Sequence, residues 1–395
     1  MFVALRDLRF ARGRFALMGA VVGMVALLMV LLTGLSTGLV DDNVSAIADL
    51  PADHLSFSAE SGVKFNQSTV TRDQWTKVAG APGVDAVAPV GNTLFNGHVY
   101  GSSDLAGQAR DEVQQQGKAV SPETAGATSI SLALFGIEPD AFVAPAVTSG
   151  SSIGGTPNGV VISNDLARKS DVKIGDVIVL DRVGTELAVV GISPKANFGH
   201  VAVIWAPLAL WQEASFGPID GGGARDGATF LALRTGAGFD PAAVDAGSGL
   251  KTVTRTAAFA GSPGYTEETG TLLMIQAFLY VIAALLVAAF FTVWTIQRTS
   301  DIGLLKALGA RTGYVIKDAL GQAAVVLVGA TAIGVLVGLA FGRAIPGNAP
   351  FALRPVPVLA AAALLVVMGL AGAGFSIRRI ARIDPLIAIS RGGAR

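Results

Sequence analysis

The stretch RTSDIGLLKALGARTGYVIKD, residues 298–318, is a short charged segment between two long apolar ones. It carries basic side chains beside an apolar helical face, and Gly309 stands where a helix would end. The basic residues are Arg298, Lys306, Arg311 and Lys317, and the apolar residues are Ile302, Leu305 and Leu308. Because the segment is too short for a domain, the pattern predicts a surface on which another protein docks at the cytoplasmic face of a membrane.

The segments on either side predict a membrane protein with four spanning helices. The mean hydropathy of +0.57, the 15% of charged residues and the absence of cysteine are unlike an average soluble chain. Four uncharged stretches exceed the ~20 residues that cross a bilayer; buried helices of a soluble core would be shorter and interrupted by polar faces. The expected spans are residues 15–40, 271–297, 319–342 and 355–377.

Basic residues predict the orientation of these spans. They are concentrated in an interfacial segment (1–14), in the 298–318 loop and in the tail (378–395), which share one side if every span crosses. That side is predicted to be cytoplasmic in a bacterial plasma membrane, with both termini inside. The 343–354 turn then faces outward, although Arg343 and Arg354 make it a mild exception. Cleavage after Ala46-Ile47-Ala48 is the alternative for the first span, but its apolar run is longer than a signal sequence needs.

The segment 41–270 predicts a large extracytoplasmic α+β domain. It contains 25 acidic against 14 basic residues, while the rest of the chain is basic, so the basic excess reflects membrane topology and not a nucleic-acid surface. Short β-branched strands alternate with short helices from Val160 onward. The Gly- and Ser-rich stretches between residues 100 and 158 predict connectors and allow two lobes. The expected fold class is therefore four transmembrane helices with an α+β domain between the first and second.

Motifs for catalysis are missing from the sequence. No phosphate-binding G-x-x-x-x-G-K-[ST] loop occurs, and the three histidines are scattered without the i,i+4 spacing of a zinc protease. We therefore expect no catalytic residues, no intrinsic cofactor and no metal site of its own. A membrane receptor or enzyme acting by itself is a competing class, and it would need a site within 41–270.

Several stretches together resemble the FtsX/MacB-type permeases of ABC transporters. Arg298–Ala310 is similar to that family's R-x-x-E-I-G-x-L-[KR]-A-L-G-A loop, with Asp301 in place of the usual glutamate. Ala381–Leu386 is similar to the family's A-x-x-x-P ending, and Phe135–Asp140 and Val160–Ile192 resemble its periplasmic core. The order of one span, an outer domain and three spans agrees along the whole chain.

The resemblance implies a non-catalytic permease subunit that forms a homodimer and docks on a separate ABC ATPase, which binds ATP and Mg²⁺. It also implies mechanotransmission, in which ATP-driven closure of the ATPases moves the outer domains. The residues of the loop that would contact the ATPase are Asp301, Ile302, Leu305, Lys306 and Leu308.

Within the family, the Arg-rich opening and the Met-rich first span resemble the heme-exporting permeases of Gram-positive bacteria, the HrtB type. Heme is flat and apolar, and its iron accepts Met, His, Tyr or carboxylate ligands. A groove lined by the first two spans would suit it, although ordinary helix packing also explains these residues. The candidate ligands are Met29 and Tyr280, and the candidate neighbours are Met24, His54, Met274 and Phe278. The alternative cargo is a peptide, a lipid-linked molecule or an antibiotic, and an FtsX-like regulator of a cell-wall hydrolase would move no cargo.

Overall fold

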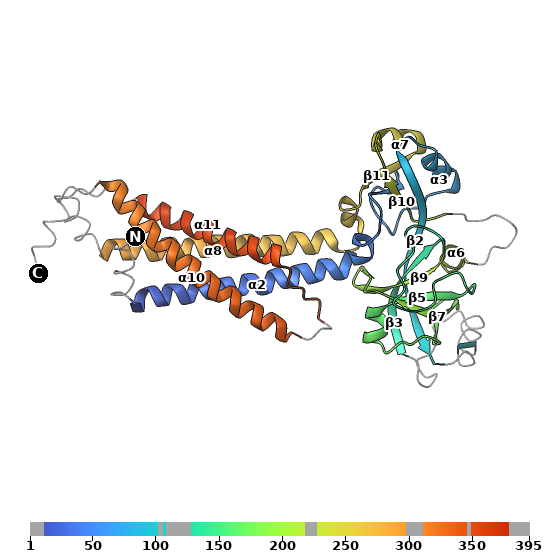
Figure 1. The fold of residues 1–395 in the computed structure, drawn as a ribbon, viewed down its shortest axis with the longest axis horizontal. Coiled ribbons are helices and arrows are strands. Elements are labelled where there is room, and N and C mark those ends of the chain that lie inside the picture. The colour runs from blue at the N-terminus through green and yellow to red at the C-terminus, as the bar shows by residue number, and fades with distance from the viewer. Residues whose placement is uncertain are drawn as a thin grey trace, which may run out of the picture. The chain divides into compact units, whose positions relative to one another are not determined.

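The computed structural model describes residues 12–101, 106–107, 128–217, 227–297, 311–345 and 349–378 (Figure 1). The chain divides into two compact units. A helical unit contains Met1–Leu39 and Glu268–Arg395, and a sheet unit contains Val40–Glu267. The expected docking loop 298–310 and the tail from residue 379 lie outside the described residues.

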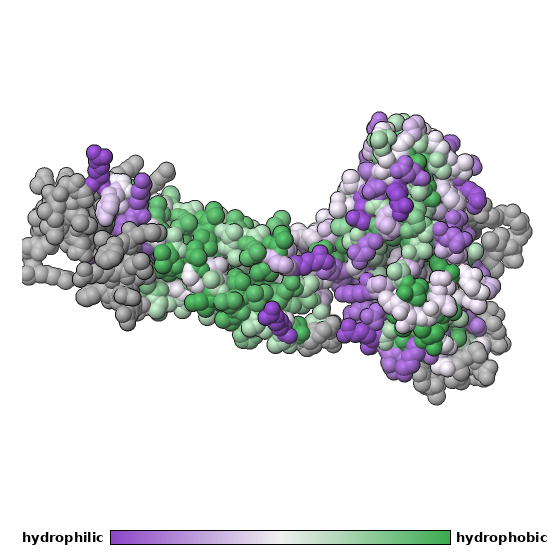
Figure 2. Space-filling view, in the orientation of Figure 1, coloured by the Kyte–Doolittle hydropathy of each residue, from purple (hydrophilic) through white to green (hydrophobic). Residues whose placement is uncertain are grey.

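Four long helices make up the described part of the helical unit: α2 (Arg12–Ala48), α8 (Tyr265–Gln297), α10 (Thr312–Ala344) and α11 (Pro355–Arg378). All four are long and apolar enough to cross a membrane, and Figure 2 shows apolar residues over their surface. Helix α2 does not end at residue 40, where the apolar run stops, but continues to Ala48 inside the sheet unit. The prediction of four membrane helices around an inserted domain is confirmed.

An apolar cluster ties the four helices together. Phe15 of α2 contacts Trp294 of α8, with ring centroids 6.2 Å apart, and Phe291 packs on the same indole at 5.8 Å. Ala323 of α10 and Ala373 of α11 complete this cluster and are fully buried. Because these residues are near the start of α2 and α10 and the end of α8 and α11, the cluster lies toward one end of the bundle. Aromatic side chains therefore hold the four helices together at this end.

The sheet unit is built around one eleven-stranded mixed sheet. Its strand order is β11-β1-β10-β2-β3-β9-β5-β7-β4, with β6 bridging β2 and β7 and β8 pairing with β9. The strands are β1 (His54–Ser58), β2 (Val84–Tyr100), β3 (Thr128–Ile137), β4 (Ser149–Gly150), β5 (Gly159–Ser163), β6 (Val177–Leu180), β7 (Glu186–Ser193), β8 (Asn197–Phe198), β9 (Val201–Pro207), β10 (Phe230–Thr235) and β11 (Leu250–Thr254). Most neighbours are antiparallel, while β3 with β9 and β5 with β7 are parallel. The predicted α+β class is confirmed.

Short helices accompany these strands: α3 (Arg72–Ala79), α5 (Asn164–Lys169), α6 (Leu208–Phe216), α7 (Pro241–Ser248) and the 3-10 turn η1 (Ala257–Gly261). The strand and helix that were expected from Val160 to Lys169 form as β5 and α5, with Ser163 capping the helix through its hydroxyl.

Alternating side chains of β3 supply two separate cores. Phe135 and Ala133 belong to an aromatic core with Phe57, Phe198 and Phe230, whereas Leu132 and Leu134 belong to an aliphatic core. This division follows from the two-residue period of a strand, which directs neighbours to opposite faces. Strand β2, 17 residues long, pairs with β10, β3 and β6, so it runs through the whole sheet.

Candidate functional site

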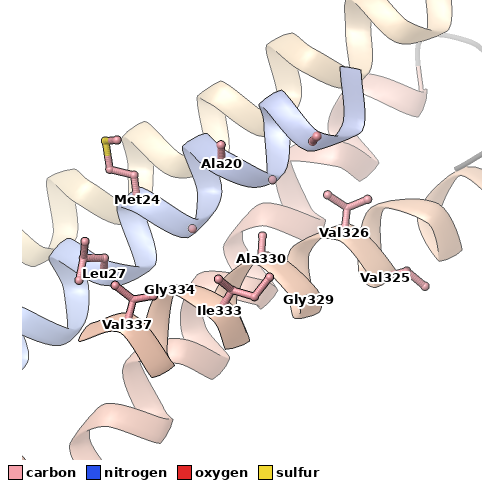
Figure 3. Close-up of a pocket in the computed structure, with 13 residues that line it drawn as sticks. Ala20, Met24, Leu27, Val325, Val326, Gly329, Ala330, Ile333, Gly334 and Val337 are labelled. Atoms are coloured by element: carbon pink, nitrogen blue, oxygen red, sulfur yellow. The ribbon is translucent and has the colours of Figure 1, made fainter. Parts of the chain in front are cut away.

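A wholly apolar groove lies between α2 and α10 (Figure 3). Its volume is about 650 Å³, within the range of small-molecule sites. Every lining residue is Gly, Ala, Val, Leu, Ile or Met, so the groove can hold an apolar molecule but offers one soft ligand, the thioether of Met24. The lining residues are Ala16, Gly19, Ala20, Gly23, Met24, Leu27, Val325, Val326, Gly329, Ala330, Ile333, Gly334 and Val337.

Small residues allow the two helices to approach beside this groove. A Cβ on Gly334 would lie against the carbonyl oxygen of Gly23 and 2.6 Å from Cβ of Ala26. A Cβ on Gly338 would lie 2.8 Å from Cβ of Val30. Gly334 and Gly338 are four residues apart on α10, a spacing typical of close helix packing, and this face lies against α2.

Of the expected heme-site residues, Met24 alone lines the groove, with 64% of its surface exposed. Met274 and Phe278 lie on the outward face of α8 and are 55% and 62% exposed. Met29 is 1% exposed, one turn beyond Ala26. The groove is formed by the first and third spans, which is a different pair from the first and second spans expected to line one.

Tyr280 and His54 have protein partners of their own. The hydroxyl of Tyr280 is 3.5 Å from the carbonyl oxygen of Ala361, and its ring packs beside Ala26. His54 belongs to the sheet unit, where its ring centroid lies 4.7 Å from that of Phe239, with the rings tilted by 42°, and its Nδ1 lies 3.3 Å from Oγ1 of Thr235. Neither Tyr280 nor His54 is among the residues that line the groove. The expected ATPase contacts Asp301, Ile302, Leu305, Lys306 and Leu308 fall outside the described residues.

A second site, which is polar, lies within the sheet unit where α2 ends. We call it the polar joint; its residues are Asp42, Asn43, Ser45, Asp165, Asn197, His200 and Ser262. It connects four segments: the last turns of α2, the helix α5, the stretch between β7 and β9, and the residues directly before α8. The only hint in the sequence is the run Asp41-Asp42-Asn43 at the end of an apolar helix.

Asn197 occupies the centre of the polar joint. Its Nδ2 donates to Oδ1 of Asp42 at 2.6 Å and to Oδ2 of Asp165 at 2.9 Å, and the side chain is 1% exposed. Its backbone N–H donates to Oγ of Ser45 at 2.9 Å. One amide therefore bridges two carboxylates and fastens the end of α2 to β8.

Positive charge surrounds the two carboxylates. Lys169 Nζ is 2.9 Å from Asp165, and Lys195 Nζ is 3.5 Å from Asp42. Burial by itself would raise the pKa of Asp165, but hydrogen bonds from Lys169 and Asn197 and the charges of Lys169 and Lys195 outweigh it. The pKa of this carboxyl is therefore below its ordinary value, and Asp165 stays ionised at neutral pH.

Asn43 extends the polar joint to the segment before α8. Its Nδ2 donates to the carbonyl of Pro263 at 2.9 Å, and its Oδ1 accepts from Oγ of Ser262 at 2.5 Å. Since the proline carbonyl can only accept, this fixes the orientation of the amide. The same Nδ2 lies 3.1 Å from Nε2 of His200, so that ring nitrogen accepts and the proton is on Nδ1, 3.7 Å from Asp42.

Profiles of known families match nearly the whole chain. The MacB-like periplasmic core domain matches residues 15–247, and the FtsX-like permease C-terminal domain matches residues 273–385. The chain belongs to the FtsX/MacB-type family of ABC transporter permeases.

Similar proteins narrow this class. A Staphylococcus haemolyticus protein named hemin transport system permease protein HrtB is 22% identical over 98% of this chain and 99% of its own length. A Mycobacterium tuberculosis protein named an uncharacterized ABC transporter permease is 24% identical, again over 98% of this chain and 99% of its own. The chain is therefore an ABC transporter permease of the HrtB/MacB type.

Two solved structures are similar to parts of the chain. The extracellular domain of the transporter YknZ from Gram-positive bacteria is 14% identical, covers 50% of this chain and 89% of its own, and has a TM-score of 0.31. The periplasmic region of MacB from Actinobacillus actinomycetemcomitans is 10% identical, covers 53% of this chain and 92% of its own, and has a TM-score of 0.34. These scores are too low to establish a shared fold by themselves.

Proposed function

We propose that this chain exports heme from the plasma membrane as the permease subunit of an ABC efflux transporter, driven by a separate ATPase. The observation that carries the proposal is similarity along the whole chain to permeases named for hemin transport. The apolar groove between α2 and α10 supports an apolar cargo that enters from the bilayer, since nothing polar lines it.

Met24 is the side chain best placed to meet such a cargo. It is exposed on the groove wall, and a thioether is a known ligand of heme iron. Met29 and Tyr280 remain candidates that require a movement of the helices, because Met29 is covered and the Tyr280 hydroxyl lies beside a carbonyl oxygen.

The energy source is proposed to act through residues 301–308. Asp301 and Lys306 would make polar contacts to the ATPase, and Ile302, Leu305 and Leu308 would form the apolar face of the docking helix. In a homodimer, two such helices would dock on two ATPase subunits. In this proposed topology the docking loop and both termini are cytoplasmic, and the domain 41–270 is on the other side of the membrane.

A hemin titration of the purified permease tests the cargo. We expect a saturable, shifted Soret band at about one heme per dimer, as for a ligated iron. Met24→Leu should alter the band, because it keeps the volume but removes the sulfur. Met368→Leu is the control, since Met368 lies on α11 away from the groove lining.

Two outcomes would contradict parts of this proposal. A spectrum equal to that of hemin in empty detergent overturns the heme cargo. Unchanged spectra for Met24→Leu, Met29→Ala and Tyr280→Phe together exclude these three residues as ligands. The docking helix is tested separately: Leu305→Asp should abolish co-purification of the ATPase, and retained association would overturn that assignment.

A further inference from the structure

Helices α2 and α10 contact each other along a seam that extends beyond the groove. A Cβ on Gly19 would lie 3.8 Å from Cβ of Ala330, and the contacts of Gly334 and Gly338 with α2 follow farther along. The residue numbers rise together on both sides of the seam, so the two helices run parallel. Because a Cβ on Gly334 has no room against α2, a rotation of either helix within the pair would force larger side chains into the seam.

The turn between α10 and α11 closes one end of this seam. The ring of Phe351 lies against Gly34 of α2, and a Cβ on Gly342 of α10 would lie 2.8 Å from Cε1 of the same ring. The backbone N–H of Ala352 donates to the carbonyl oxygen of Gly34 at 2.9 Å. We call Phe351 and Ala352 the wedge, because together they contact both helices. From Gly19 to Gly34 the seam covers about 22 Å of α2, which is most of the ~30 Å apolar core of a bilayer.

Two helices enter the sheet unit, and they differ in their connection to the proposed docking loop. Helix α8 covers Tyr265–Gln297 and runs by itself from the sheet unit to the start of that loop. Helix α2 carries Asp42 and Asn43 of the polar joint, but its other end, at Arg12, is far from the loop in the sequence. Helix α10 begins at Thr312, directly after the loop. The seam with α10 therefore gives α2 the connection that the chain itself does not provide.

We propose that α2 and α10 move as one body and that Phe351 is the positioning residue that keeps them together. A movement that begins at the docking loop then reaches the polar joint along two routes, directly through α8 and through the α10–α2 pair. The opposite behaviour is a separation of the two helices, which would widen the groove during each cycle. The inference rests on the docking loop and the ATPase of the proposed function, but it does not depend on heme as the cargo.

A reversible lock across the seam tests whether the two helices stay together. The Cβ spacing of 3.8 Å at Gly19 and Ala330 is typical of disulfides, and the natural chain has no cysteine. The double variant Gly19→Cys/Ala330→Cys therefore gives one cross-link on oxidation, which a reductant removes. Both residues line the groove, but the measurements that follow need no cargo.

Hydrogen exchange at the end of α2 reports whether movement reaches the polar joint. The full-length permease with its ATPase is compared in nanodiscs without nucleotide and after trapping with ATP and vanadate. Mass spectrometry measures exchange of the backbone amides of residues 42–48, and ATP hydrolysis is followed alongside. We expect a difference between the two states in the unmodified complex and an equal difference in the oxidised lock.

Phe351→Ala should lose this difference while ATP hydrolysis continues, because the seam then opens at the wedge. Oxidation of the Gly19→Cys/Ala330→Cys lock in the Phe351→Ala background should restore the difference, and reduction should remove it again. This rescue separates a positioning role from a general loss of folding. Phe375→Ala is the control, since that ring is on α11 and is 80% exposed, and it should behave like the unmodified protein.

Three outcomes overturn the inference. Loss of the difference in the oxidised lock, with Phe351 present, would mean that the two helices have to separate. An undiminished difference in Phe351→Ala would remove the role of the wedge. No difference between the two states of the unmodified complex, with ATP hydrolysis intact, would mean that movement does not reach α2. Because none of these readouts uses hemin, a failed hemin titration contradicts the cargo alone and leaves this test unchanged.

Discussion

Asn197 shows how much of the sheet unit depends on single polar side chains. Its amide is fully buried and donates to both Asp42 and Asp165, so two carboxylates that would repel each other share one neutral bridge. Buried polar groups of this kind are costly when one partner is lost, because the others cannot return to water. The polar joint is thus stabilised by the hydrogen bonds of Asn197 as well as by the ion pairs of Lys169 and Lys195.

Asn197→Ala is therefore expected to destabilise the sheet unit by about 2–4 kcal/mol, since it leaves the buried Asp42 and the partly buried Asp165 without their common donor. The thermal midpoint of the purified permease should fall by roughly 5–10 °C. Asn158→Ala is the control: Asn158 is exposed, and its backbone carbonyl, which accepts from Ala188, is kept by the substitution. Equal midpoints for the two variants would contradict the role given to Asn197.

Asp165 makes the same region sensitive to acid. Its pKa in the folded protein is below that in the unfolded chain, so its stabilisation is complete above about pH 4 and is lost as the pH falls through the folded value. Between pH 5 and pH 3 the midpoint of the unmodified protein should fall more steeply than that of Asp165→Asn. Asp171→Asn, at an 87% exposed carboxylate, should keep the original slope. Parallel slopes for all three proteins would argue against the lowered pKa.

At the scale of elements, the sequence predicted most of the architecture. Uninterrupted apolar runs identify the four membrane helices, because spanning length is set by the bilayer. The β-branched run before Ser163 and the capping of α5 were readable because both signals are local. The full length of α2 was not readable, because Asp41, Asp42 and Asn43 end its apolar run, whereas Ile47 beyond them is buried in the core of the sheet unit.

The site was less predictable than the fold. The spacing of Gly334 and Gly338 indicated a close-packing face, but which helix meets it depends on tertiary contacts that a repeat does not encode. Met29 and Tyr280 match heme-iron ligands by residue type, but residue type says nothing about the direction of a side chain around its helix. Rotation about the helix axis places Met24 on the groove and Met29 inside the bundle.

The contact of α2 with α10 can be tested by one substitution at two glycines of the same helix. Gly334→Ala places a methyl against the Gly23 carbonyl and Ala26, so the helices must separate, at a cost of about 1–3 kcal/mol. Gly329→Ala meets no atom within 4 Å and should be neutral. Thermal melting in detergent compares them; a stable Gly334→Ala variant would mean that this close approach is not required.

At the scale of the whole molecule, the opposite net charges of the domain 41–270 and of the rest of the chain predict the orientation in the membrane. Acidic residues predominate in 41–270 and basic residues predominate elsewhere. This is expected if the segment 41–270 is translocated across the membrane and the basic segments stay inside. The proposed orientation also puts the ATPase contacts in the compartment that contains ATP.

Cysteine labelling in intact cells checks this orientation, because the natural chain has no thiol. A membrane-impermeant maleimide should label Ala243→Cys directly, and it should label Ser390→Cys only after the cells are permeabilised. Labelling of Ser390→Cys in intact cells would reverse the predicted topology.

Helix α2 is continuous over 37 residues, about 55 Å, and contains no proline between Arg12 and Ala48. An α-helix resists stretching and twisting along its own axis, so a turn of its membrane segment cannot be absorbed within it. The turn has to appear at Asp42 and Asn43, where the side chains are fixed to β8 and to the start of α8. A rotation of the helix would therefore act first on the hydrogen bonds of the polar joint.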